Sequence, residues 1–254
     1  MSIEGKLIYI LGGSGKIGSA VAEHCNKHKA RIINLDLHNG ENNSYVFEKF
    51  DVSEIEHINQ NLESITSRNG VPEVFINCSY PRSRDWASLT FEDSTLDNLK
   101  ENINLHLLSY VWTSNFFGKK MSEHRIGGSI ILTSSIYGII PQKPNLYKNT
   151  NLSENIAYPA IKAGINHHCK QMATFYGKYN IRVNSISPGG LEGEVAGKKI
   201  KQDKTFKTNY IKRTPLGRMC KVSDLVDAYR FLASSDSGYI TGQNLIIDGG
   251  FTLS

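Results

Sequence analysis

The sequence is poor in the features that mark metal-binding, secreted and membrane-spanning chains. Its 254 residues include four cysteines, no two of which form a CxxC pair. This spacing predicts neither a zinc site nor a disulfide framework, and it favours free thiols in a reducing cytoplasm. No apolar run approaches the roughly 18 residues of a transmembrane helix. The short run Leu7–Leu11 leads into glycines and has no basic flank, unlike a signal peptide. We expect a cytoplasmic protein that binds neither metal nor membrane.

A strong charge of either sign is also missing. Lys and Arg total 29 and Asp and Glu total 24, which gives a net charge of +5. This excess suits an anionic cofactor or substrate, but it is equally typical of an ordinary surface. The most basic segment contains no aromatic residues apart from Phe206 and Tyr210, and no nucleic-acid-binding module is recognisable. A nucleic-acid partner is therefore not expected.

Short apolar runs alternate with helix-length segments along the whole chain. Strands are predicted at Leu7–Leu11, Ile32–Leu35, Val74–Ile76, Ser129–Thr133, Ile181–Ile186 and Asn244–Ile247. Helices are predicted at Lys16–His28, Leu96–Met121, Ala157–Tyr179 and Ser223–Ala233. The alternation predicts an α/β fold in which residues 1–254 form a single Rossmann-type doubly wound domain. Its parallel sheet has about seven strands, with helices on both faces.

Two long connections interrupt this alternation, at about 136–157 and 190–222. Long connections in compact domains are often functional loops, and loops at the carboxyl ends of parallel strands form the binding crevice. We expect both segments to contact the substrate.

The first strand runs directly into a glycine-rich turn and a helix. Backbone N–H groups of such a turn, and the positive end of the helix dipole, can bind a pyrophosphate. The residues expected to contact the cofactor here are Gly12, Ser14, Gly15, Lys16, Ile17 and Gly18. Asp36 ends the next strand, where a carboxylate accepts hydrogen bonds from the adenosine ribose and repels a 2′-phosphate. NAD(H) is therefore favoured over NADP(H), although Arg31 and His38 leave NADP(H) open.

Tyr158 and Lys162 are spaced to lie one helical turn apart on one face. An ammonium beside a tyrosine lowers the pKa of the phenol, so the pair can exchange a proton with a hydroxyl or carbonyl group. Such a pair also occurs by chance. Asn155 is the expected N-cap of this helix, which places Pro159 in the first turn.

The order of motifs resembles the short-chain dehydrogenase/reductase family over nearly the whole chain. The glycine turn and the Tyr-xxx-Lys pair resemble the family's, Ser135 resembles its active-site serine, and Asn104 resembles its helix asparagine. Further similarities are Asp51-Val52, Arg182-Val183-Asn184, Pro188-Gly189 and the ending Ile240-Thr241-Gly242-Gln243…Asp248-Gly249-Gly250.

The resemblance implies a role for each matching residue. Tyr158 is the proton donor and acceptor, Ser135 hydrogen-bonds the reacting oxygen, and Asn104 organises a water-linked proton path. Lys162 lowers the pKa of Tyr158 and holds the nicotinamide ribose. Further cofactor contacts are implied at Asp51, Val52, Asn77, Cys78, Ser79, Tyr158, Lys162, Pro188, Gly189 and Leu191. The family is commonly tetrameric and sometimes dimeric, so a homotetramer or homodimer is expected, formed through residues 105–117 and the C-terminus.

Three positions depart from the family pattern. Lys16 replaces the second glycine of the turn and either points at the ligands or crowds the turn. Tyr80 replaces a glycine in the segment Asn77-Cys78-Ser79-Tyr80, where it is expected to narrow or line the cleft. No threonine follows Pro188-Gly189, where one often bonds the nicotinamide amide.

The long segment between Ser135 and Tyr158, with Tyr80-Pro81-Arg82, is similar to a bacterial subgroup linked to flagellin modification and nonulosonate sugars. This favours a sugar phosphate or nucleotide sugar of surface-glycan biosynthesis as substrate. The basic residues expected to bind it are Arg82, Arg84, Lys198, Lys199, Lys201, Lys204, Lys207, Lys212 and Arg213. Each of these lysines is equally well explained as a solvent-exposed residue of a surface loop that binds no ligand. A neutral polyol or acyl-type ketone, and a non-catalytic cofactor-binding protein, remain as alternatives.

Overall fold

The computed structural model describes residues 1–40, 44–193 and 202–254. Its centre is a seven-stranded, wholly parallel sheet in the order β3-β2-β1-β4-β5-β6-β7. The strands are β1 (Leu7–Leu11), β2 (Arg31–Asp36), β3 (Val46–Lys49), β4 (Val74–Asn77), β5 (Gly128–Thr133), β6 (Ile181–Pro188) and β7 (Asn244–Ile247). The strand order reverses direction at β1, and the crevice at this point of a doubly wound sheet is the usual ligand site. The predicted fold is confirmed.

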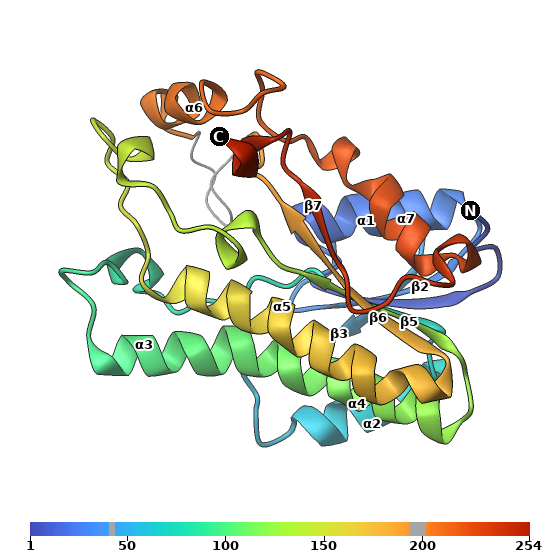
Figure 1. The fold of residues 1–254 in the computed structure, drawn as a ribbon. Coiled ribbons are helices and arrows are strands. Elements are labelled where there is room, and N and C mark those ends of the chain that lie inside the picture. Colours follow the sequence, from blue (N-terminus) through green and yellow to red (C-terminus); the bar gives the residue numbers. More distant parts are fainter. Residues whose placement is uncertain (41–43, 194–201) are drawn as a thin grey trace.

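Helices cover both faces of the sheet (Figure 1). Helices α1 (Lys16–Lys27) and α7 (Val226–Ala233) lie on one face, whereas α2 (Ile58–Asn69), α4 (Ser109–Glu123) and α5 (Ala157–Tyr176) lie on the other. Helix α3 (Leu96–Asn102) runs through a π-helical segment, η2 (Ile103–Leu108), into α4. Within the described ranges, no helix is both long and apolar enough to cross a bilayer.

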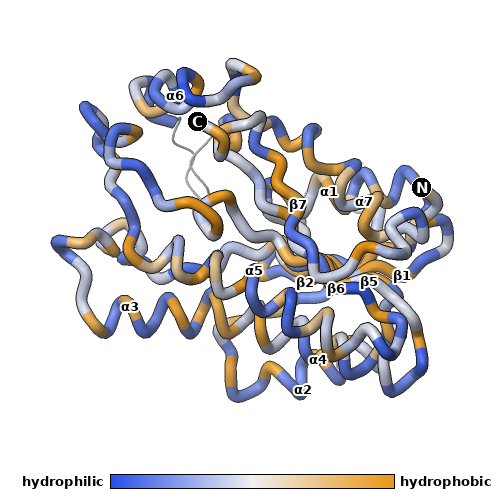
Figure 2. The backbone as a smooth tube through the Cα atoms, viewed as in Figure 1, coloured by the Kyte–Doolittle hydropathy of each residue, from blue (hydrophilic) through white to orange (hydrophobic). Residues whose placement is uncertain are grey.

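Burial on both faces explains why the strands are continuous apolar runs. Tyr9 of β1 packs on the side of α4 and α5, whereas Ile8 and Ile10 pack on the side of α1 and α7. All five residues of β1 are buried. Figure 2 shows the strands as mostly hydrophobic segments, surrounded by helices in which hydrophobic and hydrophilic residues alternate. A parallel sheet covered twice needs such runs instead of an apolar–polar alternation.

Three elements and one helix break of the structure differ from the sequence prediction. The strand β3 (Val46–Lys49) is a short, partly exposed edge strand, and α2 (Ile58–Asn69) carries many polar residues, so neither gives a clear periodic signal. Helix α6 (Lys204–Ile211) lies inside the segment predicted as the loop 190–222. The helix predicted over Leu96–Met121 is broken by η2.

A small third hydrophobic cluster lies apart from the two sheet faces. It is formed by Ile136, Leu146, Tyr210, Met219 and Phe251, which come from four segments that are distant in sequence. The rings of Tyr210 and Phe251 stack with their centroids 4.3 Å apart. This cluster joins the 136–157 connection to α6 and to the C-terminal residues.

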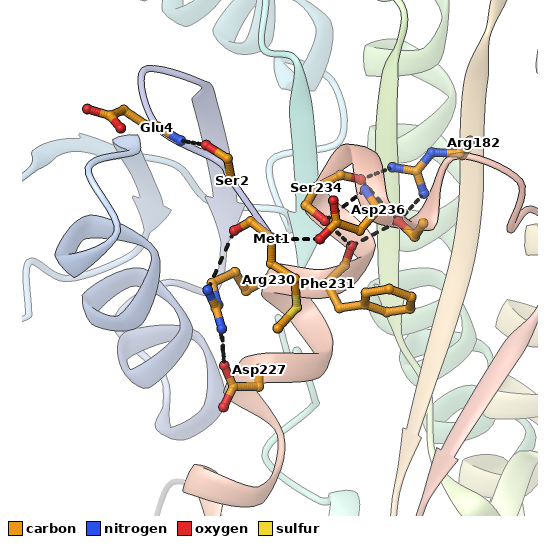
Figure 3. Close-up of polar contacts among 10 residues, drawn as sticks. Met1, Ser2, Glu4, Arg182, Asp227, Arg230, Phe231, Ser234 and Asp236 are labelled. Atoms are coloured by element: carbon orange, nitrogen blue, oxygen red, sulfur yellow. Dashed lines mark hydrogen bonds and ion pairs between the residues drawn. The ribbon is translucent and has the colours of Figure 1, made fainter.

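Polar contacts fix the chain start and α7 at the amino end of the sheet (Figure 3). The N-terminal ammonium lies 2.7 Å from the Asp236 carboxylate, and Arg230 pairs with Asp227. Arg182, at the start of β6, donates to the carbonyls of Leu232 and Ser234. These contacts stabilise the edge opposite the carboxyl ends of the strands, and the carboxyl edge carries the candidate site.

Candidate active site

The carboxyl ends of the strands bring most of the predicted site residues to one edge. The glycine turn follows β1, Asp36 ends β2, and Asn77 ends β4. Ser135 follows β5, and Pro188 ends β6. Because all seven strands are parallel, these segments line a single crevice.

The glycine turn requires glycine at two positions for steric reasons. Gly12 has a φ of +78°, and a Cβ there would lie 2.6 Å from the backbone of Ser79. A Cβ on Gly18 would lie 2.1 Å from the Gly12 carbonyl oxygen, so α1 packs directly on the turn. No side chain caps the N-terminus of α1, which begins after Gly15. The free N–H groups and the helix dipole therefore suit a dinucleotide pyrophosphate.

The end of β2 places a carboxylate beside this turn. Asp36 accepts hydrogen bonds from the N–H groups of Ser14, at 3.0 Å, and Leu37, at 2.7 Å. The Ser14 hydroxyl also donates to the His38 carbonyl. The Asp36 carboxylate is thus held beside the glycine turn, and its contact with an adenosine ribose stays a prediction. Asp51 accepts from Ser53 in the half-buried loop after β3.

Lys16 does not crowd the turn but extends across the crevice. Its ammonium donates to the Glu192 carbonyl in the segment after β6, and a Cβ on Gly193 would lie 2.6 Å from its Nζ. In the same segment the Gly190 N–H donates to the Tyr210 hydroxyl at 2.6 Å. Leu191, which follows, pairs with Cys220. The departure from the family glycine therefore places a positive charge between the glycine turn and the segment after β6.

Asn77, Cys78 and Ser79 form the opposite wall of the turn. The side-chain oxygen of Asn77 accepts from both the N–H and the hydroxyl of Ser79. The thiol of Cys78 accepts from the Thr133 hydroxyl at 3.3 Å. These contacts fix the end of β4 against β5, beside the reactive side chains.

Tyr158, Ser135 and Lys162 come together at the start of α5. The Ser135 hydroxyl interacts with the Tyr158 side chain, and the Nζ of Lys162 lies 5.7 Å from the Tyr158 ring centroid. The side chain of Asn155 accepts from the N–H groups of Ala157, at 3.0 Å, and Tyr158, at 2.8 Å. The N-cap of α5 is Ile156, one residue after the predicted Asn155. The Asn155 side chain still binds the first free N–H groups of the helix and fixes the backbone that carries Tyr158.

The protonation of this pair differs from the sequence prediction. Burial of the hydroxyl raises the pKa of Tyr158, and the interaction with Ser135 opposes that shift. Burial also lowers the pKa of Lys162 to about 7. The Nζ of Lys162 donates to the Thr133 carbonyl at 3.1 Å instead of contacting the phenol. Near neutral pH the Lys162 side chain is therefore only partly charged. In the protein without cofactor, it does not lower the pKa of the Tyr158 phenol.

The position of Asn104 also differs from the sequence prediction. Its side chain is exposed, whereas His106, two residues later, is fully buried. Both residues lie in the π-helical segment η2, whose wider turn changes which side chains face inward. The motif Asn-Leu pointed to Asn104, and no periodic signal in the sequence marked the helix break that turns His106 toward the site.

Aromatic rings surround Tyr158. The ring of Tyr80 lies 5.9 Å from it, that of Trp86 lies 6.0 Å away, and that of Tyr137 lies 6.3 Å away. Tyr80 therefore lines the cleft, as its bulk at a usual glycine position predicted. Trp86 and Tyr137 were not predicted, because single aromatic residues in loops carry no pattern.

The predicted basic residues are not gathered at one point. Arg82 lies 5.7 Å from the Tyr80 ring centroid and is close to the cleft, whereas Arg84 is exposed. In α6, Lys207 pairs with Glu192, and Lys204 is exposed. Lys212 is exposed and Arg213 is half-buried just beyond α6. The predictions for Lys198, Lys199 and Lys201 lie outside the described residues.

Comparisons with known proteins agree with this geometry. A family model described as enoyl-(acyl carrier protein) reductase matches residues 13–252. A post-translational flagellin modification protein A of Campylobacter coli is 28% identical, over 99% of this chain and 100% of its own length. An NADH-dependent L-xylulose reductase of Ambrosiozyma monospora is 26% identical, over 98% and 96%.

Among solved structures, a short-chain dehydrogenase from Leptospira borgpetersenii with bound NAD+ superposes with a TM-score of 0.87. It is 35% identical and covers 99% of this chain and 94% of its own. The family model, this solved structure and the site formed by Ser135, Tyr158 and Lys162 all indicate the same family. The chain belongs to the short-chain dehydrogenase/reductase family and is an oxidoreductase.

Proposed function

We propose that this protein is an NAD(H)-dependent oxidoreductase that interconverts a hydroxyl and a carbonyl on a small, polar, sugar-like substrate. The observation that carries this proposal is the group of Ser135, Tyr158 and Lys162 at the same sheet edge as the glycine turn. The names of the relatives support a sugar-type substrate, since they include a flagellin modification protein and a xylulose reductase. A sugar phosphate or nucleotide sugar of bacterial surface-glycan biosynthesis fits both the names and the arginine beside the cleft.

Each residue has a defined task in this reaction. The glycine turn would hold a dinucleotide, which would supply or accept the hydride. The Tyr158 hydroxyl gives a proton to the carbonyl oxygen during reduction and takes it back during oxidation. The Ser135 hydroxyl hydrogen-bonds the same oxygen, and Lys162 holds the nicotinamide ribose and replaces the proton on the phenolate. Tyr80, Trp86 and Tyr137 offer ring faces against which the carbon face of a sugar can pack.

The preference for NAD(H) rests on Asp36, which is expected to repel a 2′-phosphate. Asp36→Asn is expected to raise kcat/KM for NADPH by about tenfold to a hundredfold and to lower that for NADH by a few fold. Steady-state kinetics with both cofactors measure this. Glu56→Gln, a change at an exposed carboxylate outside the site, is the matched control and should change neither ratio. Unchanged discrimination in Asp36→Asn contradicts the assignment.

The substrate class is tested by a turnover screen with purified protein and NADH or NAD+. We expect turnover of nucleotide sugars or sugar phosphates, with KM rising several-fold in about 0.5 M salt because salt screens the contacts of Arg82 and the lysines. The same salt should leave KM for a neutral sugar almost unchanged. Fast, salt-insensitive turnover of free pentuloses or polyols instead favours the second candidate, a polyol dehydrogenase, which the name of the xylulose reductase relative supports.

Two alternative functions predict different results in that turnover screen. An acyl-type ketone as the preferred substrate agrees with the description of the family model, but the connection 136–157 is largely polar. A non-catalytic cofactor-binding protein binds NADH without turning over any carbonyl compound.

We also propose that the protein is cytoplasmic and that it forms a homotetramer or homodimer. Its four cysteines are free thiols, which fits a reducing compartment. Leu108 and Trp112, on η2 and α4, and Leu253 at the C-terminus are exposed apolar side chains and offer surfaces for subunit pairing.

A further inference from the structure

His106 is an unexplained buried polar residue next to the reactive side chains. It is 0% exposed, and neither of its ring nitrogens has a hydrogen-bond partner within the residues that the structure describes. Leaving a buried polar atom unpaired costs free energy, so nearly all such atoms in native proteins are paired with protein or water. Two unpaired nitrogens on one ring therefore indicate a site for a water molecule or a ligand group.

The surroundings of His106 place that site beside Lys162. The imidazole lies 5.2 Å from the Tyr80 ring and 5.6 Å from the Tyr110 ring. The Nζ of Lys162 lies 5.9 Å and 5.1 Å from the centroids of those same two rings. The imidazole and the ammonium thus contact the same two aromatic side chains. Burial, together with the charge of Lys162, holds the pKa of His106 well below its usual range, so the ring is neutral and can accept a hydrogen bond.

Lys162 needs such an acceptor. An ammonium has three donors, and the Thr133 carbonyl takes one of them. The nicotinamide ribose is expected to take the second. A water molecule held by His106 satisfies the third donor and one of the imidazole nitrogens together.

We propose that His106 is the positioning residue that connects Lys162 to solvent, by holding a water molecule beside the Lys162 ammonium. This inference rests on the proposed function. During reduction, the Tyr158 hydroxyl loses a proton to the substrate oxygen, and the Lys162 ammonium returns one to the phenolate. The neutral Lys162 amine then takes a proton that the water at His106 passes on from bulk solvent, so the water itself is left unchanged. During oxidation each proton moves the opposite way. His106 thus takes the part that the family resemblance assigned to Asn104.

Two substitutions separate a proton path from simple packing. His106→Phe keeps an aromatic ring in the cluster but removes both nitrogens, whereas His106→Asn keeps a polar group able to hold water but loses the ring. We expect kcat to fall about tenfold to a hundredfold in His106→Phe, with the Kd for NADH within about twofold of wild type. In His106→Asn, kcat should stay within a few fold. The opposite order, with Phe active and Asn impaired, means that His106 only packs and overturns the proposal.

A second measurement does not depend on turnover. Ultraviolet difference titration of the NAD+ complex, taken against Tyr158→Phe, follows the ionisation of Tyr158 alone. The titratable groups that face His106 are Lys162 on α5, Tyr110 on α4 and Tyr80 after β4. We expect the pKa of Tyr158 to rise by about one pH unit in His106→Phe and to stay unchanged in His106→Asn.

The kinetic and titration measurements distinguish failure of the proposed function from failure of the proposed role of His106. If no carbonyl compound is turned over by wild type, the proposed function fails, while the shift in the titration still supports the link between His106 and Lys162. An unchanged titration in His106→Phe overturns the link, even in an active enzyme.

Discussion

Tyr158→Phe is expected to lower kcat by about a hundredfold to ten-thousandfold while the Kd for NADH stays within about twofold of wild type. The change removes one oxygen, the atom that exchanges the proton with the substrate. The ring remains, and so do its contacts with Tyr80 and Trp86 at 5.9 Å and 6.0 Å. The side chain of Asn155 binds backbone N–H groups, so the start of α5 is unchanged. The fold and the cofactor site should therefore survive.

The measurement is stopped-flow and steady-state kinetics on the best substrate of the screen, together with fluorescence titration of NADH. Tyr179→Phe removes the hydroxyl of an exposed tyrosine just beyond α5 and is the matched control, with no expected effect on kcat. Retention of more than about a tenth of the wild-type kcat in Tyr158→Phe excludes Tyr158 as the proton donor.

Lys162→Met is expected to abolish turnover but to stabilise the protein in the absence of cofactor. Lys162 is 2% exposed, and burial lowers its pKa from an ordinary 10.5 to about 7. At pH 6 the lysine is charged in the folded state, which then bears the whole cost of burying that charge. Methionine has a similar length and no charge. The stability gained by removing the buried charge therefore exceeds the roughly 1 kcal/mol lost with the hydrogen bond to the Thr133 carbonyl. The increase in Tm at pH 6 should be on the order of 5–10 °C.

The pH dependence of that difference has a definite sign. Between the folded pKa of about 7 and the unfolded value near 10.5, the unfolded chain holds a proton that the folded protein has released. The free energy of unfolding of wild type therefore rises with pH across this window, relative to that of Lys162→Met. The advantage of the variant should be largest below pH 7 and small above about pH 10.

Thermal unfolding of both proteins from pH 6 to pH 10 measures this effect. Lys170→Met, at an exposed position of the same helix, is the matched control and should leave Tm unchanged at every pH. A lower Tm for Lys162→Met at pH 6 would mean that the ammonium stabilises the fold. That result contradicts the view that the fold tolerates this lysine only for its chemistry.

The sheet could be predicted from the sequence because a strand that is buried on both faces appears as a short, continuous apolar run. Runs such as Leu7–Leu11 are apolar throughout and shorter than a core helix, as is typical of a strand that is covered on both faces. The glycine turn was partly predictable as well, since the positive φ of Gly12 and the contact of Gly18 with the Gly12 carbonyl oxygen are local to the turn. The close approach of Gly12 to the Ser79 backbone, by contrast, comes from a distant segment. Tyr158 and Ser135 followed from their spacing and their motif.

The missed features depend on interactions between distant segments. The exposure of Asn104 and the burial of His106 follow from a π-helical segment that only the packing of α4 against α5 can select. The pKa of Lys162 depends on how deeply the rings of Tyr80 and Tyr110 enclose it. Helix α6 is short and carries four polar or charged residues in its first five positions, so its stability comes from the packing of Tyr210.

The third cluster also bears on how the protein moves. Ile136, Leu146, Tyr210, Met219 and Phe251 form a core far smaller than those on either face of the sheet, and the Asn209 amide adds a hydrogen bond to the Leu146 carbonyl. A unit with so few buried contacts opens at a lower free energy than the whole domain. The connection after β5, α6 and the C-terminal residues are therefore expected to exchange their amide protons together, as one foldon, while the sheet stays closed. Ligand entry and product release then depend on the stability of this small unit.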